Sequence, residues 1–224
     1  MFFVNVTSVA LIHDEIAMMK EHHSRSYLLL SALLFFFFVT WSASGSLLPI
    51  WLHQEVGLKA SDTGIIYAVL SVSALFAQVC YGFIQDKLGL RKNLLWYITV
   101  LLILSGPAYL LFGYLLKINI IMGSIFGGIY VGLTFNGGIG VLETYTERVA
   151  RQTHFEFGRA RMWGSLGWAV ATFFAGILFN IDPKLNFAVA SCSGLVFLFL
   201  LSRLHVVTDA QTAEEEGAAG KVKL

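Results

Sequence analysis

The chain has 224 residues, of which 57% are hydrophobic and 13% are charged, and its mean hydropathy is +0.73. A soluble domain carries about 25% charged residues, so this composition excludes an ordinary water-soluble domain. The net charge of +1 provides no basic field, and we expect no nucleic acid as a partner. Cys80 and Cys192 both lie inside apolar segments and offer neither a disulfide framework nor a metal-ligand spacing.

Residues 1–26 precede the first long apolar segment. They include a short apolar run but lack the basic region and the small-residue cleavage site of a signal peptide. We therefore predict a cytoplasmic tail that does not span a membrane. Polar residues follow Met18 and Met19, which makes Met19 a candidate for the natural start.

Six nearly uncharged segments follow in chain order. Their limits are 27–52, 63–85, 93–116, 118–142, 162–181 and 185–202. The hydrocarbon core of a bilayer is about 30 Å thick and requires about 20 apolar residues per helix. The sequence thus predicts an all-α membrane protein, with a bundle of six transmembrane helices over residues 27–204. Residues 205–224 are polar and rich in Glu, Gly and Ala, which is typical of the start of a cytoplasmic linker.

Basic residues are distributed unequally between the two ends of this bundle. The connections after the first, third and fifth segments contain Lys59, Lys117 and Lys184. At the other end lie Lys20, Arg25, Lys87, Arg91, Lys92, Arg148, Arg151, Arg159, Arg161 and Arg203. Because cytoplasmic loops carry the excess of Lys and Arg, we predict that both termini are cytoplasmic.

The connection between the second and third segments carries a spaced motif. Its residues are Gly82, Asp86, Lys87, Gly89, Arg91 and Lys92. Glycine permits a tight turn, and the bases hold the loop at an anionic membrane face. The spacing resembles the signature loop of the major facilitator superfamily. That resemblance implies a conformational gate and a half-fold of two inverted three-helix repeats. The alternative is a basic loop that serves topology alone.

Charged residues at the membrane edge are costly and therefore suggest function. Arg161, Ser165 and Trp168 follow one another at i, i+4 and i+7 on one helix face, and Asn136 and Glu143 share a face of the preceding helix. A guanidinium, a carboxylate, an amide, a hydroxyl and an indole are suited to binding sugar hydroxyls and stacking on a pyranose ring. Alternatively, the two charges join an interfacial network with their charged neighbours, and the indole faces lipid.

The segment 143–168 strongly resembles the lactose, raffinose and sucrose permeases of the oligosaccharide:proton symporter family. Segments 49–52, 61–66 and 86–92 resemble the same family, and the likeness covers residues 27–202. The resemblance implies that Glu143 and Arg161 are the principal sugar-binding residues of the N-terminal half and that Trp168 stacks on a sugar ring. Trp41 and Ser165 resemble sucrose permeases, whereas Glu143 and Trp168 resemble the lactose and raffinose branch, so the sugar stays open.

As a family member, the chain is expected to be the N-terminal half of a proton-coupled disaccharide or oligosaccharide symporter in the bacterial cytoplasmic membrane. The implied coupling ion is the proton, no other cofactor or metal is expected, and a C-terminal six-helix half is the expected partner. The alternative is a transport-inactive membrane fragment. An intramembrane serine protease is disfavoured because His53, His154 and His205 lie at loops or helix ends. A channel is disfavoured because no paired re-entrant loops or ring of charges is evident.

Overall fold

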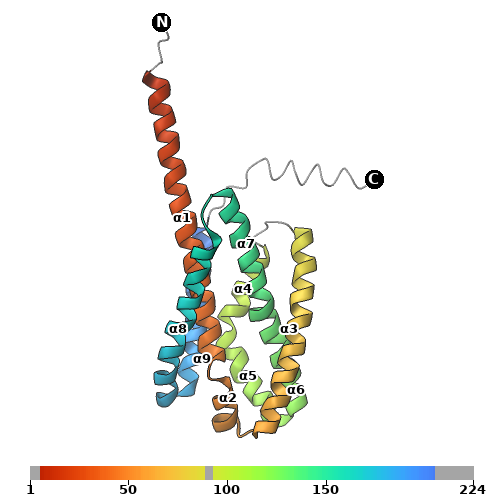
Figure 1. Cartoon of the computed structure of the whole chain (residues 1–224). Coiled ribbons are helices and arrows are strands. Elements are labelled where there is room, and N and C mark those ends of the chain that lie inside the picture. The colour runs from red at the N-terminus through yellow and green to blue at the C-terminus, as the bar shows by residue number, and fades with distance from the viewer. Residues whose placement is uncertain (1–5, 89–92, 205–224) are drawn as a thin grey trace, which may run out of the picture.

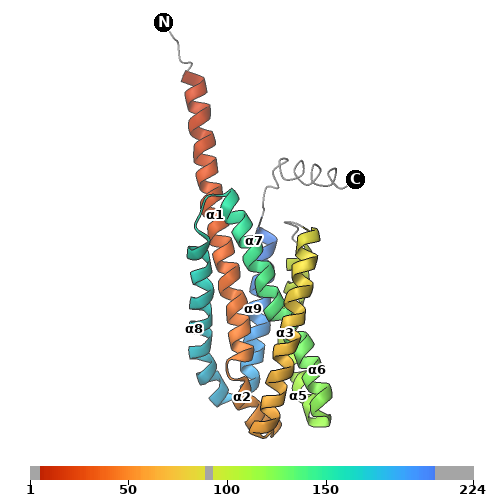
Figure 2. The same ribbon diagram turned by 45° about the vertical axis from the view of Figure 1, so that its right-hand side comes forward.

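The computed structural model describes residues 6–88 and 93–204, and every regular element in these ranges is a helix (Figures 1 and 2). In chain order they are α1 (Val6–Gly45), α2 (Leu48–Trp51), the π-helical segment η1 (Leu52–Val56), α3 (Ala60–Leu88), α4 (Asn93–Ile103), α5 (Ser105–Ile118), α6 (Ile120–Val131), the π-helical segment η2 (Gly132–Gly137), α7 (Gly138–Gln152), α8 (Phe157–Ile181) and α9 (Pro183–Arg203). The all-α prediction is confirmed.

Five helical stretches are long and apolar enough to cross a membrane. They are Arg25–Val56, Ala60–Ile84, Ile120–Gln152, Phe157–Ile181 and Pro183–Arg203. The predicted third span is divided into α4 and α5, which meet at an angle of 58°. If this bent pair forms one span, the described residues contain the six spans that the sequence predicts.

The first helix extends beyond its predicted limit. A tail was expected over residues 1–26, but α1 begins at Val6 and continues into the first span without a break. No Gly or Pro occurs between residues 6 and 44, so nothing in this stretch interrupts a helix. In Figure 1 this helix projects past the end of the other helices. The predicted linker, residues 205–224, lies outside the described residues.

The fourth helix is also longer than expected, since α7 ends at Gln152 and not at residue 142. Its extension is amphipathic. Leu142, Tyr145 and Val149 are spaced at i, i+3 and i+7 and are all buried. This packed stripe stabilises the helix past the membrane edge, so Glu143 lies within a helix and not at its end. Similarly, α8 begins at Phe157, one turn earlier than predicted.

The helices pack into two groups that share α9 and the central core. Helix α1 packs along α8 and α9, whereas α3 packs on α6 and η2, and α9 also contacts α4 and α5 (Figures 1 and 2). The core contains large buried side chains from several helices, among them Phe37, Tyr109, Phe135 and Phe197. The last residues of α3, α7 and α9 lie at one end of the bundle, and α2 lies at the other.

Candidate functional site

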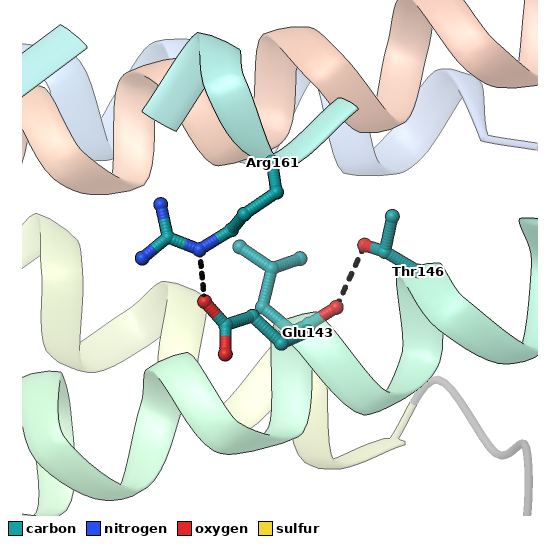
Figure 3. Close-up of polar contacts among 4 residues, drawn as sticks. Glu143, Thr146 and Arg161 are labelled. Atoms are coloured by element: carbon teal, nitrogen blue, oxygen red, sulfur yellow. Dashed lines mark hydrogen bonds and ion pairs between the residues drawn. The ribbon is translucent and has the colours of Figure 1, made fainter. Parts of the chain in front are cut away.

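An ion pair joins α7 to α8 on the side of the bundle where these helices meet. Nε of Arg161 donates a hydrogen bond to Oε1 of Glu143 (Figure 3). The two side chains remain 34% and 32% exposed. The predicted juxtaposition of acid and base is therefore present, and one edge of each group is open to a ligand.

The connection between α7 and α8 holds the two helices in this register. It spans residues 153–156, and His154 there has a φ of 54°, which turns the chain sharply. The amide of Phe155 donates to the carbonyl of Ala150, and the Phe155 ring packs edge-on against Tyr27 of α1 at 5.5 Å between centroids. Trp163 also donates to the Tyr27 hydroxyl, at 3.3 Å.

The neighbouring charges form separate pairs. Arg151 bonds Glu147 at 2.6 Å, and Arg159 bonds Glu156 at 2.9 Å, both on exposed surface. Among the described residues no ion pair joins Glu143 or Arg161 to these neighbouring charges, and the alternative of a purely interfacial role stays a prediction. On α7, the Thr146 hydroxyl donates to the carbonyl of Leu142, so it does not occupy the carboxylate of Glu143 (Figure 3).

Aromatic rings from α1 complete this region. The guanidinium carbon of Arg161 lies 4.5 Å from the centroid of the Phe38 ring, a cation–π arrangement. Phe38 stacks on Trp41 at 5.8 Å, and Trp41 meets Trp168 edge-to-face at 5.6 Å. Trp168 packs against the core and is partly exposed, and what its exposed part faces stays a prediction.

Polar contacts fix α8 against α1 beside these rings. The Ser42 hydroxyl donates to the carbonyl of Trp168 at 3.2 Å and lies 2.7 Å from the hydroxyl of Thr172. Ser42 is fully buried. These bonds fix the position of Trp168 along the axis of α1, because they join the backbone of Trp168 to the helix that carries Trp41.

The two remaining predicted residues form no hydrogen bond with the ion pair in the part of the chain that the structure describes. Ser165 is exposed on α8. Asn136 belongs to η2, where its side-chain amide donates to the carbonyl of Val131 at 3.4 Å. Together with Trp41 it lines an open pocket of about 460 Å³ whose lining includes neither Glu143 nor Arg161. Five of the six predicted residues therefore belong to the aromatic–charged cluster or to the pocket edge, and Ser165 belongs to neither.

Phe38 was not among the predicted site residues. A signal existed, because Phe38 precedes Trp41 by three residues and shares its helix face. In a run of four phenylalanines, however, nothing in the sequence distinguishes the ring that contacts the guanidinium.

The predicted gate loop is described only in part. Gly82 and Lys87 are exposed near the end of α3. The Asp86 side chain, and Gly89, Arg91 and Lys92 entirely, lie outside the described residues, so the gating role stays a prediction.

Comparison with known proteins identifies relatives. Residues 18–223 match the family model described as LacY proton/sugar symporter. The raffinose permease of Escherichia coli is 46% identical over 77% of this chain and 41% of its own length. The lactose permease of Citrobacter freundii is 45% identical, over 76% of this chain and 42% of its own length. The sucrose permease of Escherichia coli is 41% identical, over 82% of this chain and 44% of its own length.

This chain therefore spans about two fifths of the length of these relatives. Each is named a permease, so at the family level the comparison supports a transporter and not an enzyme. The apolar helices agree with a multi-pass membrane protein. Because the family model covers nearly all of the sequence and several relatives exceed 40% identity, the chain belongs to the LacY proton/sugar symporter family.

Proposed function

We propose that this chain supplies the N-terminal, sugar-binding half of a proton-coupled disaccharide or oligosaccharide symporter. The observation that carries the proposal is the ion pair between Glu143 and Arg161, which is held beside aromatic rings and left partly exposed. A charged pair at a membrane-spanning bundle is costly, so its retention at an accessible position supports a role in binding.

The chemistry of the pair suits a neutral polyhydroxyl ligand. Nε of Arg161 is occupied by Glu143, and the other guanidinium nitrogens retain donors for sugar hydroxyls. Glu143 likewise keeps acceptor capacity at its second carboxylate oxygen. Trp168 offers an aromatic surface on which the apolar face of a pyranose can stack, whereas the Trp41 ring already stacks against Phe38 and Phe135.

The remainder of the proposal concerns the membrane and the partner. The protein lies in the bacterial cytoplasmic membrane with both termini in the cytoplasm, which the unequal distribution of Lys and Arg supports. A second six-helix half closes the other wall of the sugar site and carries the residues that bind the coupling proton, since this chain spans about two fifths of its relatives.

Uptake of labelled sugars tests the proposal. The chain is expressed in transport-deficient cells with the C-terminal half of a related permease, and uptake of sucrose, raffinose, lactose and melibiose is measured. We expect uptake of at least one sugar, and we expect Glu143→Gln and Arg161→Lys each to lower it about tenfold or more. Hydrogen bonds to charged groups contribute about 1.5–3 kcal/mol, which corresponds to this range.

The matched control is the second Glu–Arg pair on α7. Glu147→Gln and Arg151→Lys alter an exposed pair within one helix and outside the site, and we expect less than a twofold change (about 0.4 kcal/mol). Uptake that is insensitive to Glu143 and Arg161, or that is equally sensitive to the control pair, would contradict the proposed site. Correct membrane insertion without uptake of any sugar would favour a transport-inactive fragment.

A further inference from the structure

A second feature lies next to the ion pair but is separate from it, namely the open pocket of about 460 Å³. Residues of α1, α2, α3, α5, α6 and η2 line it, so six elements converge on one space. Its volume falls within the range of about 300–1,000 Å³ typical of small-molecule sites. The depression therefore has the dimensions of a binding site.

The polar lining of this pocket is neutral. It presents the indole of Trp41, the phenols of Tyr67 and Tyr109, the hydroxyl of Ser71, and the amides of Gln78 and Asn136. None of the residues that line it is charged, as far as the structure describes the chain. Amides and hydroxyls both donate and accept hydrogen bonds, which matches the hydroxyls of a sugar, whereas an ionic ligand would find no counter-charge.

Several of these groups are available to a ligand. The Gln78 side chain is exposed and forms no hydrogen bond with the described residues, and Ser71 donates only to the Tyr67 carbonyl within its own helix. Gly45 forms part of the wall. A methyl group added at Gly45 would lie 3.6 Å from the Trp41 ring and 4.0 Å from the Tyr109 hydroxyl. The absence of a side chain there leaves space beside the Trp41 ring.

Trp41 connects the pocket with the ion pair. One part of its ring system lines the pocket, while the ring also stacks on Phe38, over which the Arg161 guanidinium lies at 4.5 Å. Trp41 also meets Trp168 edge-to-face. A ligand that binds Arg161 and extends past Phe38 and Trp41 would reach the pocket.

We propose that the pocket is a subsite for a second, uncharged sugar ring of the same substrate whose first ring binds at Glu143 and Arg161. The inference rests on the proposed function of that ion pair. In this proposal, Ser71, Gln78 and Asn136 recognise the second ring and so distinguish a disaccharide from a monosaccharide. Trp41 lies between the positions of the two sugar rings. A one-ring sugar would not use this pocket.

The test compares each disaccharide with its one-ring analogue. The whole chain, assembled with the C-terminal half of a related permease, is placed in lipid nanodiscs, and Kd values and ring-resolved saturation transfer are measured by NMR. The ligand pairs are melibiose with methyl α-galactoside and sucrose with methyl α-glucoside. The variants are Ser71→Leu, which fills the pocket, and Gln78→Leu, which removes the amide at similar size. Cys80→Leu on exposed α3 surface outside the lining is the control.

We expect both lining variants to weaken the bound disaccharide about three- to tenfold, the range for one lost hydrogen bond. They should also reduce saturation of one ring only and leave the one-ring analogue unchanged. Unchanged disaccharide binding in both variants, with binding still lost in Glu143→Gln, would overturn the subsite and leave the proposed function intact. If the unmodified chain, assembled with the C-terminal half of a related permease, binds none of these sugars, both proposals fail.

Discussion

At the scale of single residues, glycine decides how closely α8 approaches α1. A Cβ atom at Gly167 would overlap the backbone carbonyl of Phe35, whereas Gly176, further along the same helix, has nothing within 4 Å. Backbone cannot move aside as a flexible side chain can. Gly167 is therefore a contact point between helices, as small residues are in membrane bundles.

Gly167→Ala should consequently lower stability. We expect a loss of about 1–3 kcal/mol, the usual cost of overpacking, seen as a lower midpoint of thermal unfolding in detergent. The matched control is Gly176→Ala, which gains helix propensity without a clash and should leave the midpoint unchanged or raise it. Equal midpoints for both variants would show that α1 and α8 adjust to a methyl group at this contact.

The same scale shows what sequence can predict about a site. The juxtaposition of Glu143 with Arg161 followed from a short connection between two helices, which leaves the adjoining turns little freedom. Phe38 did not follow, because its contact with Arg161 depends on how α1 rotates against α8. Packing sets that rotation, including the hydrogen bond from Ser42 to the Trp168 carbonyl. The local sequence does not predict it.

At the scale of elements, the third span is broken where the sequence predicted one continuous helix. Pro107 accounts for the break, because it has no N–H to donate to the preceding turn. Two contacts from other helices satisfy backbone groups near the bend. Tyr130 of α6 donates to the Leu101 carbonyl at 2.7 Å, and the Gly106 amide donates to the Ser191 hydroxyl at 2.9 Å.

These two contacts should stabilise the bend. We expect Tyr130→Phe and Ser191→Ala each to lower the free energy of unfolding by about 0.6–1.5 kcal/mol, the range for hydrogen bonds inside proteins and membranes. Urea unfolding followed by circular dichroism provides the measurement. Tyr114→Phe is the control for Tyr130→Phe, because Tyr114 lies on α5 of the bent span and its side chain is 63% exposed. A loss in Tyr114→Phe as large as that in Tyr130→Phe would count against the role of the bend.

The π-helical segments illustrate the limit of prediction for elements. Pro107 was a visible signal for the break, but η2 has no comparable signal, since it contains no Pro and its glycines resemble those of the preceding helix. The wide turn moves Asn136 to the pocket beside Trp41. Helical spacing alone grouped Asn136 with Glu143, whereas the pocket depends on the packing of α3 against η2.

At the scale of the whole molecule, charge is divided between the two ends of the bundle. Arg148 and Arg151 near the end of α7, and Arg203 at the end of α9, lie at the end where α3 also terminates. Lys59 precedes α3, and Lys117 lies in the last turn of α5, near the opposite end beside α2. The sequence could predict this division because six spans alternate direction.

This division predicts the orientation in the membrane. After Cys80 and Cys192 are replaced by Ser, single cysteines are introduced as Lys59→Cys, before α3, and Gln152→Cys, at the end of α7; both positions are exposed. In spheroplasts, a membrane-impermeant maleimide should label the first variant and reach the second only after lysis, because cytoplasmic ends carry the excess of Lys and Arg. Lysed samples of both variants control for reactivity. Labelling of Gln152→Cys before lysis, with Lys59→Cys protected, would reverse the orientation and place the ion pair nearer the extracellular end of the bundle.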